Sequence, residues 1–474
     1  MLWDPATAEL HNLVVRDAKV RTRRGLVSAK TPTAGTAYVA GWSIESQSTT
    51  EVWHYLFEQS TTTSVVTLQV VDEEFNSVFS LPIGPTQGRP VVTKAVTLNQ
   101  VMINSPSFSG PLYGLVGGGL VQALKSTSAN PDTTSLDIPP GHITAWGDRS
   151  PIAVGNNLLF NDPPKPDPRA YVAKNVVPLG GVIFDHFTGP DGALYVFTSQ
   201  DTYVIAADAL GQGQTVTGFI STLTGLNPSR PGNAVTSNGV IACLARDGLV
   251  TIAGGVQTRV PLMTYQGKRY LSFPGEMSDY RDGRLFPTST GFLLSFGTRR
   301  KHAIHIDVRN GFRSVLWTQT GAPLDVVGML RSRDGEDFPV LSNRVVQYLG
   351  STDFDATAVR GVAASRIEVP PDQTPTIRSI TVKADNVGQP VGMSVGAATR
   401  TNTTPAKTRD VVIGTGLWSA SGQLNGRELR TTRMQCDQRV TDLEVEVSID
   451  GGDRGLGPVD VEVQGQGTTR RDRM

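Results

Sequence analysis

The sequence contains little of what metal sites and disulfide scaffolds require. It has 2 cysteines and 6 histidines among 474 residues. Cys243 lies within the apolar segment VIACLA, where a buried free thiol is the expected state, and Cys436 stands far away in another context. His302 and His305 are three residues apart, and in a strand this odd spacing places the two rings on opposite faces. We therefore predict no disulfide and no metal site.

The sequence also lacks the apolar run of a membrane helix, which needs about 18 residues. Its first residues, MLWDPATAEL, lack the basic and apolar regions of a signal peptide. We therefore expect a soluble protein made in the cytosol, with no membrane anchor. Neither sign of charge is in excess, because Lys plus Arg and Asp plus Glu number 43 each. This balance argues against a dedicated nucleic-acid-binding protein, which is usually basic overall.

Catalytic signatures are missing as well. The chain has no G-x-S-x-G elbow, no H-E-x-x-H and no Walker loop. Residues 117–119 form a triple glycine, but no Lys-Ser/Thr follows it, so a flexible turn is the better interpretation. The acidic residues 72–74, and Asp353 with Asp355, match no calcium-loop spacing and are interpreted as solvated turns. We therefore expect neither catalysis nor a cofactor.

What the sequence does contain is a recurring phrase: an apolar strand, a glycine-containing turn and a second apolar strand. Hairpins of this kind start every 42 to 52 residues, which is close to the roughly 40–50 residues of a four-stranded propeller blade. The starts lie near Val52, Val101, Ile152, Leu194, Val240, Phe292 and Val340. We predict an all-β protein with a β-propeller of about seven blades. A set of β-sandwiches, with strands every 8 to 12 residues or so and no longer repeat, is the alternative.

Several turns are chemically suited to hairpins. Asn-Gly and Asp-Gly pairs tolerate the positive φ of type I′ turns, and Asn238-Gly239 is one of them. Asn156-Asn157 is predicted to turn in the same way between IAVG and LLF. Residues 161–169, NDPPKPDPR, cannot pair in a sheet because proline lacks the N–H donor. We expect these residues to form an exposed loop.

A change of pattern near Arg366 predicts a domain boundary. The proline-rich segment VPPDQTP follows, and beyond it the strands are longer and alternate strictly. In LEVEVSI and VDVEVQG the apolar and polar side chains occupy opposite faces, and the loop between these two strands is predicted to join them as a hairpin. We predict a propeller over residues 1–365 and a small C-terminal β-sandwich over residues 366–474.

A local basic cluster stands out against the neutral average. In a strand, Lys19, Arg21 and Arg23 would share one face. The segment is either a sheet edge protected by charge or a contact with an acidic neighbouring subunit or with passing DNA. Both interpretations stay open, and residues 12–27 are a candidate interface arm. The members of the cluster are Arg16, Lys19, Arg21, Arg23 and Arg24.

Six short phrases follow one another in order along the chain. It opens with NLVVRD and VRTRRG, continues with GALYVFT and TYVI, then with RSVLWTQTGAP, and finishes with VEVQGQGTTRR. Together they resemble the β-propeller tail tubular or nozzle proteins of short-tailed bacteriophages. The phrases are short but span most of the chain, which is shorter than many nozzle proteins and has no obvious large inserted domain.

The resemblance implies a non-enzymatic structural protein of the virion, synthesised in the host cytoplasm. Such proteins assemble as rings, usually hexameric, below the portal and adaptor proteins. They line the DNA exit channel and offer attachment points for tail fibres. A net charge of zero agrees with this role, because DNA must slide past without tight neutralisation of its phosphates.

Two other functions remain as alternatives. A propeller that binds carbohydrate or protein, such as a phage receptor binder, would present aromatic side chains on exposed loops, and residues 161–169 contain none. A propeller enzyme would gather acids, histidine or arginine at the mouth of a central channel, often with Ca²⁺. The sequence favours the structural protein over both.

Overall fold

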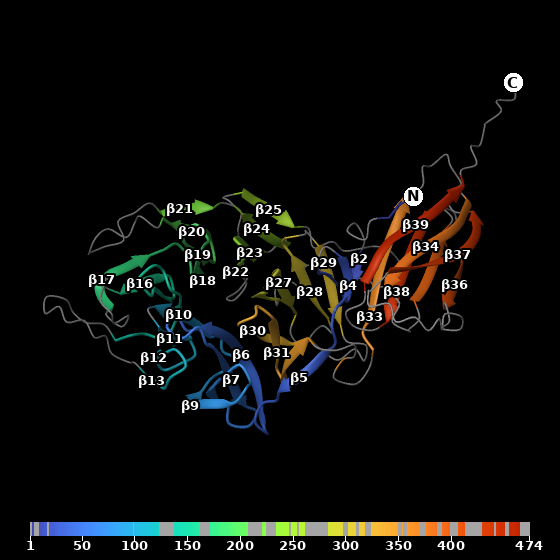
Figure 1. Cartoon of the computed structure of the whole chain (residues 1–474). Coiled ribbons are helices and arrows are strands. Elements are labelled where there is room, and N and C mark those ends of the chain that lie inside the picture. Colours follow the sequence, from blue (N-terminus) through green and yellow to red (C-terminus); the bar gives the residue numbers. More distant parts are fainter. Residues whose placement is uncertain are drawn as a thin grey trace.

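The computed structural model consists of β-strands. It describes residues 2–3, 9–16, 19–97, 99–122, 137–161, 171–206, 220–223, 234–245, 248–253, 256–260, 283–296, 302–309, 312–317, 324–348, 353, 358–368, 376–385, 391–398, 406–412, 429–439, 442–450 and 455–464. Within these ranges every regular element is a strand, which confirms the predicted all-β class. Small sheets surround a centre, and a second group of strands lies to one side (Figure 1).

Consecutive strands form antiparallel groups of four. The first groups are β6 (Thr36–Glu45), β7 (Val52–Ser60), β8 (Val65–Val71) and β9 (Ser77–Pro85); β10 (Thr93–Thr97), β11 (Gln100–Asn104), β12 (Leu112–Leu115) and β13 (Leu120–Gln122); β14 (His142–Ile143), β15 (Ile152–Val154), β16 (Asn157–Asn161) and β17 (Tyr171–Pro178). The next are β18 (Ile183–Thr188), β19 (Leu194–Thr198), β20 (Thr202–Ile205) and β21 (Ile220–Leu223); β22 (Ala234–Ser237), β23 (Val240–Ala245), β24 (Gly248–Ala253) and β25 (Val256–Val260); β26 (Arg284–Pro287), β27 (Gly291–Ser295), β28 (His302–Asp307) and β29 (Phe312–Trp317). Last come β30 (Val326–Arg331), β31 (Asp337–Leu341) and β32 (Arg344–Tyr348), to which β5 (Leu26–Lys30) adds a fourth strand. The succession of small sheets around a centre is propeller-like.

The core is divided among the spaces between successive sheets, as β23 illustrates. Ile241 and Cys243 pack with the side chains of β19. Their chain neighbours Ala242 and Leu244 pack with those of β27. Because side chains alternate along a strand, one strand serves two neighbouring sheets and reads as a continuous apolar run. The buried free thiol predicted for Cys243 is confirmed.

The turn predictions have mixed outcomes. Asn238 and Gly239 both have positive φ, at 51° and 74°, and Ser237 pairs directly with Val240 across them. This confirms the predicted two-residue turn. The prediction for Asn156-Asn157 is wrong by one residue, because Val154 already pairs with Asn157. The turn there uses Gly155, whose φ of 60° costs glycine nothing.

Two sheets join where the strands β30 and β6 run side by side. They form one eight-stranded sheet, in which Met329 pairs in parallel with Trp42. The approach is close because two glycines face each other. A Cβ atom added to Gly328 would lie 2.4 Å from the carbonyl oxygen and 2.5 Å from the amide nitrogen of Gly41. Backbone atoms cannot move aside as the end of a flexible side chain can.

We predict that Gly328→Ala lowers the free energy of unfolding by about 3 kcal/mol, because the methyl group would force β30 away from β6. Urea denaturation of the purified protein measures the change. Gly118→Ala is the matched control, because its Cβ would meet nothing nearer than the Leu115 Cβ at 3.4 Å; we expect a change within about 0.5 kcal/mol. Equal midpoints for the two variants would contradict the prediction.

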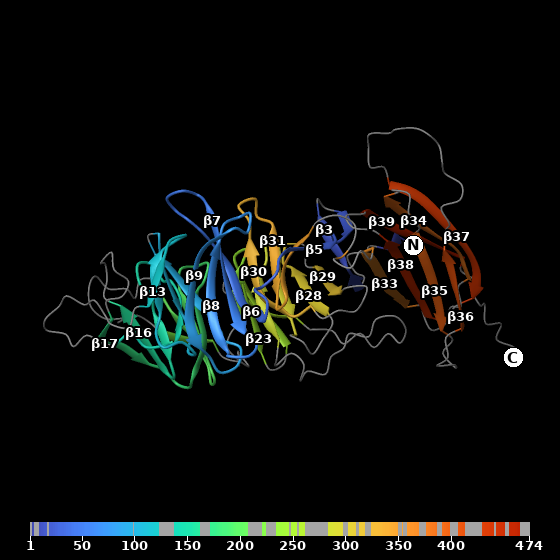
Figure 2. The same cartoon turned by 90° about the horizontal axis from the view of Figure 1, so that it is seen from below.

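The remaining strands come from both ends of the chain. They are β1 (Leu2–Trp3), β2 (Glu9–His11), β3 (Leu13–Arg16), β4 (Lys19–Thr22), β33 (Arg360–Glu368), β34 (Thr376–Asp385), β35 (Val391–Ala398), β36 (Ala406–Val412), β37 (Leu429–Arg439), β38 (Asp442–Asp450) and β39 (Gly455–Gln464). One sheet has the order β3-β4-β39-β34-β37, with β1 also paired to β39. The other continues from β29 through β2 to β33-β38-β35-β36. These sheets lie beside the propeller-like part (Figure 2).

The predicted hairpin between the last two strands is wrong. β38 pairs with β33 and β35, whereas β39 pairs with β34, β4 and β1, so the two strands lie in different sheets. Strict alternation identifies a strand with one buried face but not its pairing partner. The loop between them therefore crosses from one sheet to the other.

The pairing also connects the two ends of the sequence. Strands β1, β2 and β4 pair with C-terminal strands, although they belong to the predicted 1–365 unit. Strand β33 begins at Arg360, before the predicted boundary. The proposed division at 365/366 stays a prediction. Of the predicted exposed loop at residues 161–169, Asn161 ends β16 and is buried; residues 162–169 lie outside the described residues.

Candidate functional site: a cavity lined by the first strands

A cavity of about 830 Å³ lies where the small sheets meet. Its walls come from β6, β10, β14, β18, β22, β26 and β30, each of which is the first strand of its four-strand group. Volumes of roughly 300–1,000 Å³ are typical of small-molecule sites. The cavity is therefore the natural place to search for function.

Lys94 is the most unusual group on the cavity wall. Its Nζ donates a hydrogen bond to the Ser43 carbonyl oxygen at 2.6 Å. It also lies 5.6 Å from the centre of the Trp42 ring, within the range of a cation–π contact. Burial, followed by the positive charge of Arg331, lowers the pKa of Lys94 to about 7. The amine thus titrates near neutral pH.

Ser43 connects this lysine to two neighbouring strands. Its Oγ accepts a hydrogen bond from the backbone N–H of Arg331 at 2.7 Å and lies 2.8 Å from His54 Nδ1. Burial lowers the pKa of His54 to about 4, against a weaker opposing effect of Asp72, so the ring is neutral. Among the described residues the other ring nitrogen, Nε2, has no hydrogen-bond partner. The pair therefore lacks the oriented histidine of a hydrolase triad.

Arg331 and Arg89 mark the two ends of β30. Arg331 is the last residue of this strand, and its Nε bonds Asp337 Oδ1 at 3.1 Å. Arg89 forms a two-pronged ion pair, at 3.1 and 2.8 Å, with Asp325, which immediately precedes the strand. Arg284 lines the cavity; burial and then the charge of Arg89 lower its pKa. Because Asp325 and Arg331 lie at opposite ends of β30, the ion pair of Arg89 is about 20 Å from the position of Arg331.

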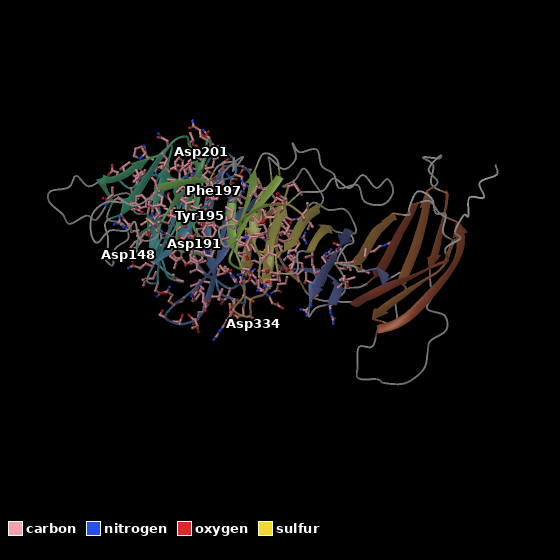
Figure 3. The ribbon with its side chains drawn as sticks, turned by 90° about the horizontal axis from the view of Figure 1, so that it is seen from above. Asp148, Asp191, Tyr195, Phe197, Asp201 and Asp334 are labelled. Carbon is pink, nitrogen blue, oxygen red and sulfur yellow. The ribbon has the colours of Figure 1, made fainter. Side chains whose placement is uncertain are left out.

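Aromatic side chains support the wall formed by β18. Phe187 lines the cavity and stacks on Tyr195 and Phe197, with ring centres 6.1 and 5.4 Å away. The Tyr195 hydroxyl donates to Asp191 Oδ2 at 2.8 Å. Asp191 lies in the turn between β18 and β19, and both residues are labelled in Figure 3. Burial and the nearby carboxylate raise the pKa of Tyr195 to about 12. Phe187 is thus the apolar part of this wall, beside Asp185 and His186.

Two neighbouring first strands each carry a buried histidine, His142 on β14 and His186 on β18, and His186 also lines the cavity. His186 Nε2 lies 3.0 Å from the Pro151 carbonyl oxygen, and the ring is 3% exposed. Burial lowers the pKa of both His142 and His186 to about 4; the neighbouring His186 adds to the effect on His142. In the described part of the chain, the Nδ1 atoms of both rings have no hydrogen-bond partner. Both histidines are therefore neutral at neutral pH.

Arg23 of the predicted basic cluster is enclosed rather than displayed. Its guanidinium is bonded to Asp353 through NH1 at 2.7 Å and NH2 at 2.9 Å, and the two side chains are 2% and 0% exposed. Its Nε bonds Asn12 Oδ1 at 3.0 Å, and the Leu26 N–H donates to Asp353. The interpretation of Asp353 as part of a solvated turn is wrong. These bonds serve the fold.

The other members of the cluster are dispersed. Arg21 is buried, at 9% exposure, and Arg24 lies 3.6 Å from Glu336 with a partly exposed side chain. Arg16 and Lys19 lie on β3 and β4, but their side chains are outside the described residues. A role of these residues as interface or DNA-channel contacts stays a prediction.

Sequence reasoning missed Lys94, and one signal could have indicated it. The lysine interrupts the otherwise uncharged segment VVTKAVTL, and a charge inside an apolar strand is costly unless it has a partner or a function. Within the described ranges no three His, Cys, Asp or Glu side chains gather as metal ligands. Nor do those ranges contain a helix that could cross a membrane.

The comparisons with known proteins concern the fold. No family model matches the chain, and no curated protein is significantly similar to it in sequence. One similar structure is the extracellular domain of a hybrid two-component system protein from Bacteroides thetaiotaomicron, at 8% identity and a TM-score of 0.40, over 69% of this chain and 39% of that one. A chain of the mitotic checkpoint complex is 8% identical with a TM-score of 0.40, and the match covers 69% of this chain and 95% of that one. A quinoprotein alcohol dehydrogenase-like protein from Bacteroides thetaiotaomicron is 11% identical with a TM-score of 0.35, and the match covers 66% of this chain and 68% of that one. The chain thus spans 39% of the length of the first of these proteins.

Proposed function

We propose that the four-strand groups form a closed propeller of seven blades, beside a C-terminal two-sheet sandwich. The support is that seven first strands line one cavity. Contacts run from β10 to β14, on through β18, β22 and β26 to β30, and from β30 to β6. The N-terminal strand β5 completes the last blade by pairing with β32, in register from Val345↔Lys30 to Tyr348↔Leu26.

On this architecture we propose a structural protein of a bacteriophage tail, which forms a ring (nozzle or tail tube) around the DNA exit channel. The observation that carries the proposal is the resemblance of the ordered phrases to nozzle proteins, together with the propeller-like platform. One continuous sheet runs from β29 through β2 into the C-terminal strands, so the two parts can transmit load as a unit. The partners are further copies of the chain, portal or adaptor proteins and tail fibres.

The cavity constrains how DNA would pass. A volume of about 830 Å³ has the size of a small-molecule site, so duplex DNA would run between protomers at the ring axis and not through one propeller. Transient passage needs no specific DNA binding, and zero net charge avoids tight phosphate neutralisation.

We predict that the purified chain assembles into rings with a central opening. Light scattering after size exclusion gives the number of protomers, and negative-stain microscopy gives the ring. Mass spectrometry of phage particles that carry this gene tests the virion location. A chain that stays monomeric over a wide concentration range, and is absent from those particles, would overturn the proposal. The Gly118→Ala variant, which leaves the sheets intact, serves as the control for handling artefacts.

A binding function is the second candidate, and the cavity itself favours it. A pocket of this volume with an amine and polar backbone groups on its wall fits a propeller that takes up a ligand.

A further inference from the structure

The ammonium group of Lys94 is poorly neutralised where it lies. Its hydrogen-bond partner is a neutral carbonyl, Ser43 O, and its other contact is the Trp42 ring. Among the described residues no carboxylate forms an ion pair with it. A lysine ammonium has three donors, so two remain for another acceptor. Enclosed charges normally have a partner of opposite sign.

A second cation faces the same part of the cavity. Arg331 lines the wall, and its charge acts on Lys94. The backbone of Arg331 is fixed by its bond to Ser43 Oγ, and Nε is held by Asp337. Its terminal nitrogens make no hydrogen bond to any residue that the structure describes, and the side chain is 45% exposed. With Arg284, the lining carries three basic side chains against the two carboxylates of Glu45 and Asp185, and an excess of positive charge attracts an anion.

We propose that the cavity binds a small organic anion, whose carboxylate or phosphate group lies between Lys94 and Arg331. Oxygen atoms of such a group accept from an ammonium and from a guanidinium in charge-assisted hydrogen bonds. The apolar remainder of the ligand packs against Phe187, Phe286 and Met329, which line the same cavity. This site is independent of ring assembly, so the two proposals stand or fall separately.

Calorimetric titration with phenyl phosphate and with benzoate tests the proposal, at about pH 6, where Lys94 is charged. We expect one saturable site per chain for at least one of the two probes. The tighter probe identifies the headgroup as phosphate or carboxylate. Lys94→Met, which keeps the length of the side chain but removes the charge, is expected to weaken binding by about tenfold or more, because it removes a charged hydrogen bond.

Lys30→Met is the matched control. Lys30 also donates to a carbonyl oxygen, that of Phe75 at 3.0 Å, but it lies outside the cavity lining. We expect the Lys30→Met variant to bind the probes with the affinity of the wild type. Arg331→Gln is expected to weaken binding about tenfold. If Lys94→Met binds as tightly as the wild type, or if neither probe gives saturable binding to the wild type, the proposal is overturned.

The pH dependence supplies a readout that a purely structural lysine would not change. Binding to the wild type is expected to weaken as the pH rises above about 7, because the free protein loses the Lys94 proton. Lys94→Arg keeps its charge throughout and is expected to bind with little change over the same range. This variant also keeps the proposal testable if Lys94→Met fails to fold. A pH dependence identical in wild type and Lys94→Arg would contradict the assignment of Lys94.

Discussion

Replacement of Asp353 by alanine is expected to lower the free energy of unfolding by about 3–5 kcal/mol, as is usual when one partner of a buried ion pair is removed. The variant leaves the Arg23 guanidinium, 2% exposed, without the carboxylate that accepts from both of its terminal nitrogens. It also removes the acceptor of the Leu26 N–H. Urea denaturation followed by circular dichroism measures the loss.

Glu336→Ala is the matched control for Asp353→Ala. Glu336 is also the partner of an arginine, Arg24, but the two side chains are 49% and 31% exposed at a distance of 3.6 Å. Exposed pairs contribute about 0–1 kcal/mol. The double variant Arg23→Met with Asp353→Leu should recover most of the loss, because it buries no unpaired charge. Equal effects of the two single variants would show that the buried pair has no special role.

Acid is expected to destabilise the protein steeply between about pH 6.5 and pH 4. Burial holds the pKa values of His54, His142 and His186 near 4 in the folded state, below the ordinary value of 6.5. In that window the unfolded chain binds protons that the folded chain does not, so stability is present above pH 6.5 and falls as the pH decreases. Each histidine contributes a slope of about 1.4 kcal/mol per pH unit.

Urea midpoints measured at a series of pH values test the histidine prediction. His142→Gln is expected to reduce the slope around pH 5 by about one proton. Above pH 7 it should follow the wild type, whose stability there still rises with pH because burial lowers the pKa of Lys94 to about 7. Lys30→Met, which leaves all three histidines in place, should keep the full wild-type slope. A His142→Gln slope equal to that of the wild type would contradict the assignment.

The strands and their spacing could be predicted because they depend on local patterns. Period-2 alternation and turn chemistry are written within a few residues, as at Asn238-Gly239, whose turn the structure confirms. The apolar run VIACLA likewise indicated a buried thiol at Cys243, and the structure confirms it.

Partners far apart in the sequence could not be predicted. The pairing of β39 with β34 instead of β38 depends on which edges the rest of the chain leaves open. Asp353 resembled any loop aspartate, and its ion pair with Arg23 spans 330 positions. The same holds for the site, since Lys94, Ser43 and Arg331 come from three different strands and Ser43 is hydrogen-bonded to both of the others. No local pattern carries that information.

The pairing of β5 with β32 has a consequence for synthesis on the ribosome. The strand that contains Lys30 has no partner until Val345 has been synthesised. At a translation rate of about 5–20 residues per second, this takes on the order of 15–60 seconds. Strand β1 waits longer still, for β39, whereas β3 and β4 pair with each other as soon as both have emerged. Strands β1, β2 and β5 thus stay unpaired while the middle of the chain folds. They are the strands most exposed to mispairing with another nascent copy.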